Sequence, residues 1–336
     1  MGYFRQNVAI DIGTATVLMY LEDKGIVVNE PSLVAVKHGS SKIVAIGHEA
    51  KTMLGRTNED TEVIQPIRGG VVSLFSLTKK MISYYLNSSI KNPLHRILKP
   101  DVMIAVPIHT TNVEKRAVER VAQEAGCARV FMIEEPLAAA IGSGLDIEKA
   151  CGHMIVDIGG GTTDVAVISF EGIVSGKSIK VAGDHFDEAI SAYIKKKYAM
   201  LIGPLEAEAI KKNIACLYHG MEQKKMEIHG TDLIDGSFKE KVITSDELME
   251  TMMEVAVPIL DCIHEVLEST PPELAGDIYG RGILMTGGGS LIKGLDELVH
   301  RSTGIDVAVA EEPALCVVKG AYKVLTNMSE AQKTNI

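Results

Sequence analysis

The chain has 336 residues, of which 46% are hydrophobic and 23% are charged. These values are typical of a globular protein and exclude wholesale disorder, and the length allows two domains of ordinary size. The formal net charge of −10 argues against a surface that neutralises nucleic-acid phosphates, so we expect no nucleic-acid partner.

The ends of the chain and its cysteines favour the cytoplasm. Residues 1–6 lead directly into a predicted strand without an apolar signal segment, and no apolar run reaches the roughly 20 residues that span a bilayer. The five cysteines lie far apart and include no CxxC pair, which favours neither a disulfide framework nor a zinc site. We therefore expect a protein of the reducing cytoplasm whose membrane contact is peripheral.

Residues 8–20 predict a β-hairpin, because two apolar stretches flank a turn that begins at Gly13. A helix is predicted over residues 113–125, with a capping box of Thr111 and Glu114 at its start. Further strands are predicted for residues 25–36, 42–47, 102–107 and 130–133. Strand, helix and strand in this order predict an α/β domain.

Residues 154–168 predict a second hairpin that repeats the first. In both, a strand ends in Asp-Ile-Gly, at Asp11 and at Asp157, and a turn with threonine leads into another strand. This duplication predicts two related halves. The remaining elements are predicted as helices over residues 187–198 and 206–217, a helix opened by the capping box of Thr244 and Glu247, a strand from about residue 278, and a helix over residues 291–298.

Gly13 to Thr16 and Gly159 to Thr163 predict two phosphate-binding loops. Glycine turns allow several main-chain N–H groups to point into one concavity, which suits a phosphate. Asp11 and Asp157 end the adjacent strands and are candidates to seat a hydrated Mg²⁺. A single hairpin of this kind is most often an ordinary tight turn, but two copies with their aspartates in register favour phosphate binding.

Glu135 is the candidate for orienting an attacking water, because phosphoryl transfer depends on positioning and charge compensation. Glu134 and Glu135 precede Pro136 in the first turn of an alanine-rich helix. A glutamate there also complements the helix dipole, and the local sequence favours neither role over the other.

Three further features carry weaker signals. The glycine cluster from Gly287 to Gly289 lies between a strand and a helix, where glycine serves close packing as well as contact with a base or ribose. Glu208 and Lys211 lie one helical turn apart and can reach a ribose, although such a pair is more often a solvated ion pair. Residues 184–187 (DHFD) resemble a metal cluster, but a loop and helix-start role is favoured.

Four motifs resemble those of the actin superfamily, in the same order along the chain. They are residues 11–15 (DIGTA), 134–142 (EEPLAAAIG), 157–164 (DIGGGTTD) and 286–290 (TGGGS), which look like its two phosphate motifs, its connecting motif and its adenosine motif. Within the superfamily, residues 25–32 (GIVVNEPS), 182–184 (AGD), 271–274 (PPEL) and 319–320 (KG) are similar to the MreB family. The resemblance covers nearly the whole chain.

The resemblance implies an actin-like α/β fold of two pseudo-symmetric ribonuclease-H-like domains around a nucleotide cleft. It implies a slow ATPase that polymerises with itself into paired protofilaments on the inner face of the cytoplasmic membrane, where it guides cell-wall elongation proteins and rod shape. ATP and Mg²⁺ are the implied cofactors. The implied sites are Glu135 and Thr162 for water activation, Asp11 and Asp157 for Mg²⁺ through water, and Gly13, Thr14, Ala15, Thr16, Gly159, Gly160, Gly161, Thr162, Gly183, Glu208, Ala209, Ile210, Lys211, Gly287, Gly288, Gly289 and Ser290 for the nucleotide.

The resemblance also implies a division of the chain. The first half is expected to comprise residues 1–145 and 312–336, with a small subdomain at about 31–68. The second half is expected to comprise residues 146–311, with a large subdomain at about 146–182 and 259–311 and a small one at about 183–258.

The sequence departs from the family pattern at four positions. The family usually has Asn at Thr16, an acidic residue at Pro204, Glu at Asn213 and Gly at Ala215. Thr16 and Pro204 are expected to alter nucleotide affinity or turnover. Because the water-activating pair is intact, we expect slow hydrolysis of ATP rather than none.

Membrane contact is expected at residues 93–99, where apolar and basic residues alternate in a pattern suited to an anionic interface. The alternative is that Leu94, Ile97 and Leu98 pack on the domain. Two rival functions also remain open: a small-molecule kinase of the same superfamily, for which no second-substrate base is evident, and a chaperone ATPase, for which the chain has no substrate domain.

Overall fold

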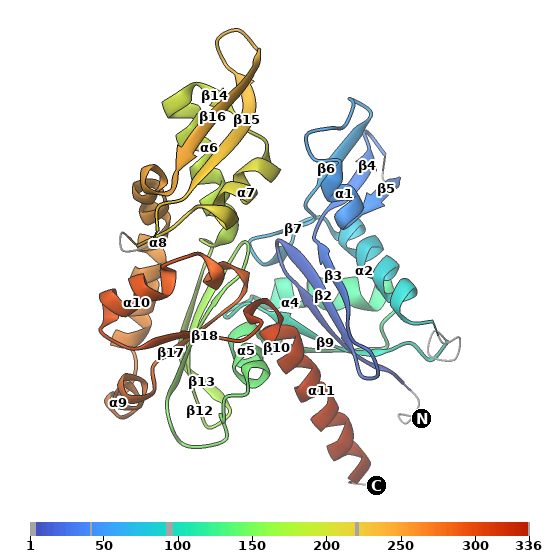
Figure 1. Ribbon diagram of the computed structural model, residues 1–336. Helices are drawn as coiled ribbons and strands as arrows, with labels where there is room; N and C mark the ends of the chain where they lie inside the picture. The colour runs from blue at the N-terminus through green and yellow to red at the C-terminus, as the bar shows by residue number, and fades with distance from the viewer. Residues whose placement is uncertain (1–4, 41, 92–96, 219–221, 335–336) are drawn as a thin grey trace.

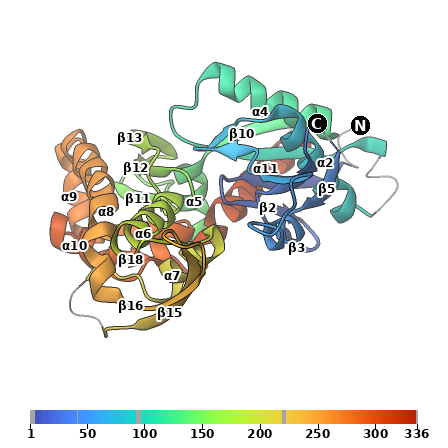
Figure 2. The same cartoon turned by 90° about the horizontal axis from the view of Figure 1, so that it is seen from above.

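The computed structural model describes residues 5–40, 42–91, 97–218 and 222–334. Two five-stranded sheets form its base (Figures 1 and 2). In the first sheet the strands lie in the order β10 (Arg129–Glu134), β9 (Asp101–Val106), β1 (Asn7–Ile12), β2 (Thr16–Leu21) and β3 (Gly25–Pro31). In the second the order is β18 (Val307–Val309), β17 (Ile283–Thr286), β11 (His153–Ile158), β12 (Thr163–Ser169) and β13 (Gly172–Ile179).

The two sheets have the same pairing pattern. In each, the first strand of a hairpin (β1 or β11) pairs antiparallel with the next strand and parallel with a strand that arrives later in the chain (β9 or β17). A third antiparallel strand extends one edge, and a second parallel strand extends the other. The duplicated hairpins that the sequence predicted are therefore the centres of two sheets with one topology.

Two helices lie between the sheets and belong to a shared core. These are α5 (Glu135–Ser143) and α11 (Cys316–Thr334), seen at the centre of Figure 1. Their residues Ala138–Ala140 and Val317–Val318 pack with Ala9 of the first sheet and with Ile155 of the second. The chain thus crosses between the halves twice, and both crossings are anchored in apolar packing.

The outer face of each sheet is covered by other helices. On the first sheet, α2 (Phe75–Ser89) and α4 (Asn112–Ala125) close one hydrophobic core. On the second, residues of α6 (Gly183–Tyr198), α8 (Ser245–Glu268), α9 (Pro272–Arg281) and α10 (Leu295–Thr303) close another. Both predicted capping boxes are confirmed: Thr111 and Glu114 cap α4, and Thr244 and Glu247 cap α8.

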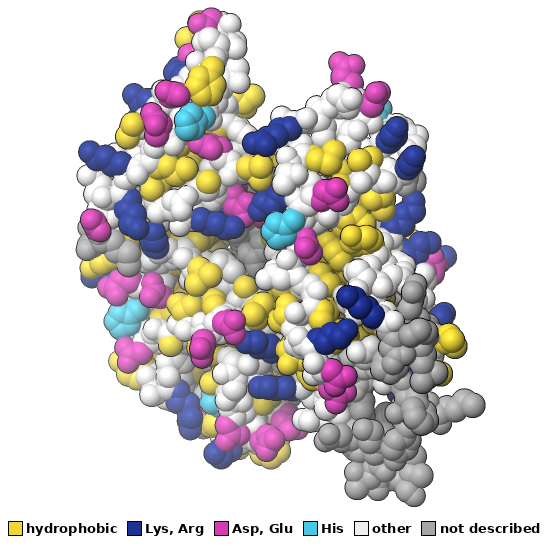
Figure 3. Space-filling view, turned by 45° about the vertical axis from the view of Figure 1, so that its right-hand side comes forward, with side chains coloured by type: hydrophobic (Ala, Val, Ile, Leu, Met, Phe, Trp, Pro, Cys, Tyr) yellow, Lys and Arg dark blue, Asp and Glu magenta, His cyan; other side chains and the backbone are white. Residues whose placement is uncertain are grey.

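Two smaller units stand above the sheets (Figure 1). One comprises β4 (Val34–Lys37), β5 (Ile43–Ile46), β6 (Thr61–Ile64) and α1 (His48–Thr52), followed by the short ribbon of β7 (Ile67–Arg68) and β8 (Val71–Val72). The other comprises β14 (Met200–Leu201), β15 (Lys225–Asp232), β16 (Phe238–Thr244) and α7 (Pro204–Asn213). Figure 3 shows a notch between the tips of these units, and charged side chains of both signs where they meet below it.

Four predicted elements have the wrong bounds. The helix predicted over residues 187–198 is α6, which begins at Gly183. The helix predicted over residues 206–217 is α7, which ends at Asn213 because Cys216 pairs with Lys293 in an isolated bridge. The strand predicted from about residue 278 begins only at Ile283, because α9 continues to Arg281. The helix predicted over residues 291–298 begins at Leu295, after a 3₁₀ turn (η2, Gly288–Leu291) and the left-handed Gly294. A second 3₁₀ turn (η3, Pro313–Leu315) precedes α11.

Candidate functional site

The first predicted phosphate loop joins β1 to β2, and its carbonyl groups are bonded to neighbouring segments. Ser32 donates from its hydroxyl to the Gly13 carbonyl (2.6 Å) and from its main chain to the Ala15 carbonyl (2.9 Å). The Gln65 amide donates to the Thr14 carbonyl (2.8 Å). Among the described residues, no acceptor is bonded to the N–H groups of Gly13, Thr14 and Ala15. The loop therefore has its acceptors satisfied and its donors available, as an anion-binding turn requires.

The second loop, between β11 and β12, is arranged in the same way. The Gly159 carbonyl accepts from Gly183 N (3.1 Å), and the Gly160 carbonyl accepts from Asp184 N (2.8 Å), so the first turn of α6 holds the loop. Within the described chain, the N–H groups of Gly160, Gly161 and Thr162 donate to no acceptor, whereas Gly159 N donates to Thr162 O (2.9 Å). Gly183 thus lies beside the loop, as the resemblance implies.

The two loops face and contact each other. A Cβ atom added to Gly160 would lie 2.5 Å from the Ala15 Cβ atom, and one added to Gly161 would lie 2.5 Å from the Thr14 hydroxyl oxygen. Such approaches are too close for any side chain, so only glycine permits this contact. The Thr14 hydroxyl is held in turn by Gly70 N (2.9 Å). The structure thus brings the two predicted loops together at one site between the halves.

Carboxyl groups from both halves gather beside the loops. Asp11 lies on β1, Asp157 on β11 and Glu135 at the start of α5; Asp157 and Asp164 are paired across β11 and β12. The Thr286 hydroxyl donates to Asp157 Oδ1 (2.8 Å), and Ile108 N donates to Asp164 Oδ1 (2.7 Å). Among the residues that the structure describes, Asp164 Oδ2 is buried without a hydrogen-bond partner, and the nearby Ser178 side chain lowers the pKa of this carboxyl.

The electrostatics of this carboxylate cluster (Asp11, Glu135, Asp157 and Asp164) favour a bound cation. Burial and the charge of Asp157 raise the pKa of Asp11 to about 7. Burial also raises the pKa of Asp157 to about 6 and of Asp164 to about 7. Burial and the charges of Asp164, Asp11 and Asp157 raise the pKa of Glu135 well above its usual value. Like charges in a poorly solvated site have this effect, and a hard cation relieves it.

The carboxylate cluster does not form a cage of direct metal ligands. In the described ranges, no three His, Cys, Asp or Glu side chains are placed to hold a metal ion together. The oxygen-only set fits Mg²⁺, which commonly keeps several waters between itself and a protein carboxylate. At residues 184–187 the helix-start role is confirmed, because α6 begins at Gly183 and Ala182 N donates to His185 Nδ1 (3.3 Å).

The third glycine cluster is used in part for packing. Gly287 has a φ of 78°, and a Cβ atom there would lie 2.3 Å from the Ile158 carbonyl oxygen. Gly289 is buried against the Ile158 side chain in the same way, and Ser290 is buried with its hydroxyl on the Gly287 carbonyl (2.7 Å). Only Gly288 faces open space. The close-packing role thus holds for Gly287 and Gly289, which place the cluster directly behind the second phosphate loop.

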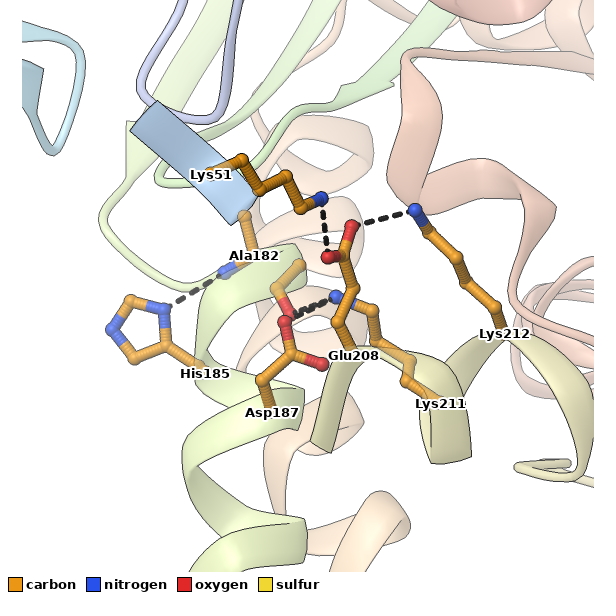
Figure 4. Close-up of polar contacts among 8 residues, drawn as sticks. Lys51, Ala182, His185, Asp187, Glu208, Lys211 and Lys212 are labelled. Atoms are coloured by element: carbon orange, nitrogen blue, oxygen red, sulfur yellow. Dashed lines mark hydrogen bonds and ion pairs between the residues drawn. The ribbon is translucent and has the colours of Figure 1, made fainter. Parts of the chain in front are cut away.

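The residues of α7 predicted to hold the nucleoside have different partners. Glu208 and Lys211 do not pair with each other, so the expected ion pair between them is wrong (Figure 4). Lys211 donates to Asp187 Oδ2 (2.7 Å) and to the Gly183 carbonyl (2.8 Å), which ties α7 to α6. Ile210 is fully buried in the hydrophobic core, whereas Ala209 is half-buried. Ile210 therefore offers no surface to a ligand in this conformation.

Glu208 is held by two lysines, and one of them comes from the other half of the molecule. Lys51 of α1 donates to its Oε2 atom and Lys212 donates to its Oε1 atom, each at 2.5 Å. Burial alone would raise the pKa of Glu208, but the hydrogen bonds from Lys212 and Lys51 lower it to about 2. Glu208 is therefore a carboxylate at neutral pH.

Sequence reasoning missed three residues that build this site. Lys51, Gln65 and Gly70 lie on the segment between β5 and β8, far along the chain from the glycine motifs. No local pattern marks them, because their roles depend on how the halves meet. Asp164 carried a signal, since it ends the second glycine motif and has no counterpart in the first.

Comparison with known proteins decides the family. A family model described as MreB/Mbl protein matches residues 5–333. The chain belongs to the MreB/Mbl family. The cell shape-determining protein MreB of Escherichia coli (strain K12) is 45% identical over 328 residues, which cover 96% of this chain and 94% of that protein. The cell shape-determining protein Mbl of Bacillus subtilis (strain 168) is 41% identical over 333 residues and 99% of each chain.

Solved structures establish the fold of this MreB/Mbl family member as actin-like. MreB5 of Spiroplasma citri bound to AMPPNP matches with a TM-score of 0.93 and 36% identity over 99% of each chain. A MamK double helical filament matches with a TM-score of 0.81 at 22% identity, over 96% of this chain and 99% of that one, and shows the fold alone. The fold class predicted from the sequence is confirmed.

The departures from the family pattern fall on defined structural positions. Thr16 begins β2 and pairs with Pro31 on β3. Pro204 is the first residue of α7, a position where proline suits a helix but supplies no negative charge. Asn213 ends α7, and Ala215 is buried just beyond it.

The predicted membrane segment lies partly outside the described residues, since Leu94 is not among them. Ile97 is 78% exposed, so packing on the domain is wrong for this residue, whereas Leu98 is half-buried. A search of the described helices finds none with the length and apolar character to cross a bilayer.

Proposed function

We propose that the chain is a bacterial actin that binds ATP with Mg²⁺ between its two halves, hydrolyses it slowly and assembles into filaments. The observation that carries this proposal is the contact between two loops whose N–H groups are available, beside four carboxyl groups of raised pKa. Two loops that contribute donors from opposite halves suit a chain of phosphates. In support, the related MreB5 structures hold AMPPNP and ADP.

Each group has a distinct role in this proposal. Residues 13–16 and 159–162 form the phosphate site, in which the available N–H groups of residues 13–15 and 160–162 bind phosphate oxygens. Glu208, Lys211 and residues Gly287 to Ser290 hold the nucleoside. Asp11 and Asp157 hold Mg²⁺ through water, and the bound ion supplies compensation for phosphate charge. Glu135 and Thr162 orient the attacking water, which the raised pKa of Glu135 supports because it makes the carboxylate a stronger proton acceptor.

The cellular role that we propose follows the relatives, which are named cell shape-determining proteins. In this role, paired protofilaments of the chain lie on the inner face of the cytoplasmic membrane and position cell-wall elongation proteins. Ile97, with its exposed side chain, and its neighbours Leu94 and Leu98 provide the membrane contact. An exposed apolar side chain at the protein surface suits insertion into the headgroup region.

We propose the domain division that the resemblance implies. Residues 1–145 and 312–336 form the first half, with a small subdomain at about 31–68. Residues 146–311 form the second half, with subdomains at about 146–182 and 259–311 and at about 183–258. In support, each five-stranded sheet and each three-stranded sheet falls within one of these ranges.

Electron microscopy and turnover assays test the function together. Purified protein is incubated with Mg²⁺ and with ATP, ADP or no nucleotide, then imaged on a lipid monolayer and in solution while phosphate release is followed. Paired filaments that require nucleotide, with slow phosphate release, are the expected result. Persistent monomers whose turnover rises with an added sugar or other small acceptor would instead identify a kinase of the same fold.

A further inference from the structure

An ion pair joins the two small units across the mouth of the site. Lys51 lies on α1 in the first half and Glu208 on α7 in the second, 157 residues apart, yet their Nζ and Oε2 atoms are 2.5 Å apart. Figure 4 shows the Lys51 side chain reaching from α1 to the Glu208 carboxylate, with Lys212 on its other side. The side chains of Lys51 and Glu208 are only 28% and 25% exposed. The pair is thus more sheltered than an ordinary surface ion pair.

Other contacts join the same parts of the two halves below this pair. The Gln65 side chain, from the segment that follows β6, is anchored within its own half by donating to the Thr14 carbonyl (2.8 Å). Burial raises the pKa of Asp184, and Lys211 and the Gln65 side chain oppose that rise, which places Gln65 against the first turn of α6. Closer to the sheets, Ile108 N donates to Asp164 Oδ1 (2.7 Å). Lys51–Glu208 is the one of these cross-half contacts in which both partners are charged.

The pair and a nucleotide can use the same carboxylate. A carboxylate has about four acceptor positions, and Lys51 and Lys212 each use one, so a ribose hydroxyl can still bind Glu208. When a ligand is bound to Glu208, the same carboxylate is also bonded to Lys51 of α1. The ligand can leave the site only when the two small units separate. This separation lengthens the Lys51–Glu208 contact between the halves, but not the Lys212–Glu208 contact within α7.

We propose that the Lys51–Glu208 ion pair is a latch that slows the release of bound nucleotide. This inference rests on the proposed function, because it takes a nucleotide between the halves as given. The latch acts on the opening of the site and makes no contact with the phosphates. It therefore controls the rate of nucleotide dissociation rather than the chemistry of hydrolysis.

The test measures the dissociation of N-methylanthraniloyl-ATP, a fluorescent ATP analogue, from the full chain with Mg²⁺. The complex is mixed rapidly with excess unlabelled ATP, at low salt and at a protein concentration too low for filaments. Lys51→Ala is expected to raise the dissociation rate about three- to fivefold, the range for loss of a modest ion pair. Lys51→Arg is expected to keep the rate within about twofold of the parent rate, since the charge is retained.

Lys212→Ala is the matched control. It removes the other lysine from the same carboxylate, at the same 2.5 Å separation, but breaks no contact between the halves. Its dissociation rate is expected to stay close to that of the parent. Equal acceleration in the Lys51→Ala and Lys212→Ala variants, or no acceleration in the Lys51→Ala variant, would overturn the latch while leaving the nucleotide site intact. A parent protein that binds no analogue would overturn both the latch and the proposed function.

Discussion

The structure adds most to the sequence-based interpretation of Glu135. At the start of α5, a glutamate complements the helix dipole. Glu135 also lies close enough to three aspartates that their charges, together with burial, raise its pKa. In the Glu135→Ala variant we expect phosphate release to fall about 100-fold, because a positioned base contributes on that order, while nucleotide affinity is retained. Single-turnover phosphate release and analogue binding measure the two effects.

The control for this variant is Glu134→Ala, one residue earlier at the same helix entrance. It removes a similar charge without removing the proposed base. Comparable losses of hydrolysis in both variants would assign the effect to the helix start, and a Glu135→Ala protein as active as the parent would exclude the water-orienting role.

Gly161 shows why the two loops need glycine. A Cβ atom there would lie 2.5 Å from the Thr14 hydroxyl oxygen and 2.8 Å from the Thr14 Cβ atom. We expect the Gly161→Ala variant to lose about 1–3 kcal/mol of unfolding free energy, as for an overpacked core, and to bind the ATP analogue at least tenfold more weakly. Gly288→Ala, with nothing within 4 Å of the new methyl group, is expected to unfold at the same denaturant concentration as the parent. Equal midpoints for the two variants would show that the loops can separate freely.

At the scale of elements, α5 and α11 approach each other closely at two glycines. A Cβ atom on Gly142 would lie 1.8 Å from the Cys316 carbonyl oxygen, and one on Gly320 would lie 1.8 Å from the Ala138 carbonyl oxygen. These atoms are main chain and cannot move aside without displacing a helix. We therefore expect the Gly320→Ala variant to lose roughly 3 kcal/mol or more of unfolding free energy, measured by urea denaturation.

A helical glycine without such a contact provides the comparison. Gly276 lies inside α9, and a Cβ atom there would meet nothing within 4 Å. Gly276→Ala is expected to raise the unfolding free energy by about 0.5–1 kcal/mol, from helix propensity alone. A Gly320→Ala protein as stable as the Gly276→Ala protein would contradict the packing described for α5 and α11.

Elements whose signals are local could be predicted from the sequence, and those set by distant contacts could not. The hairpins of Asp11 and Asp157 and the caps of α4 and α8 depend on neighbouring residues, and the structure confirms them. The end of α7 depends on a bridge between Cys216 and Lys293, which no local pattern encodes. The same holds within the site. The glycine loops are visible in the sequence, whereas the partners of Glu208 appear only when the halves meet.

At the scale of the whole molecule, apolar packing holds the two halves together, whereas like charges repel them. The shared core around α5 and α11 holds the two sheets together at the base. Above it, the carboxylate cluster places like charges from both halves close to one another. A ligand that binds both loops and brings a cation removes this repulsion, so nucleotide binding is expected to stabilise the closed arrangement as well as the fold.

This repulsion predicts how stability depends on pH. Because the pKa of Asp11 is raised to about 7 and that of Asp157 to about 6, the folded chain keeps protons that the unfolded chain releases near pH 4. The free energy of unfolding should therefore fall as pH rises from about 4 through 7. The pKa of Glu208 is lowered to about 2, so its titration affects the free energy of unfolding only below this pH range. Without ligand, we expect the melting temperature to decrease between pH 5.5 and 7.5 at constant ionic strength.

Asp11→Asn tests whether the carboxylate cluster causes this dependence, since the amide keeps the shape and removes one charge. At pH 7.5 the variant is expected to be more stable than the parent by about 1–2 kcal/mol, and its melting temperature should change less with pH. With Mg²⁺ and ATP bound, the melting temperature of the parent protein should change less with pH. The bound cation offsets the repulsion between the carboxylates, which protons relieve when no cation is bound. A parent protein whose stability rises from pH 5.5 to 7.5, or a variant with the parent's slope, would show that the charges of Asp11 and its neighbours do not oppose closure.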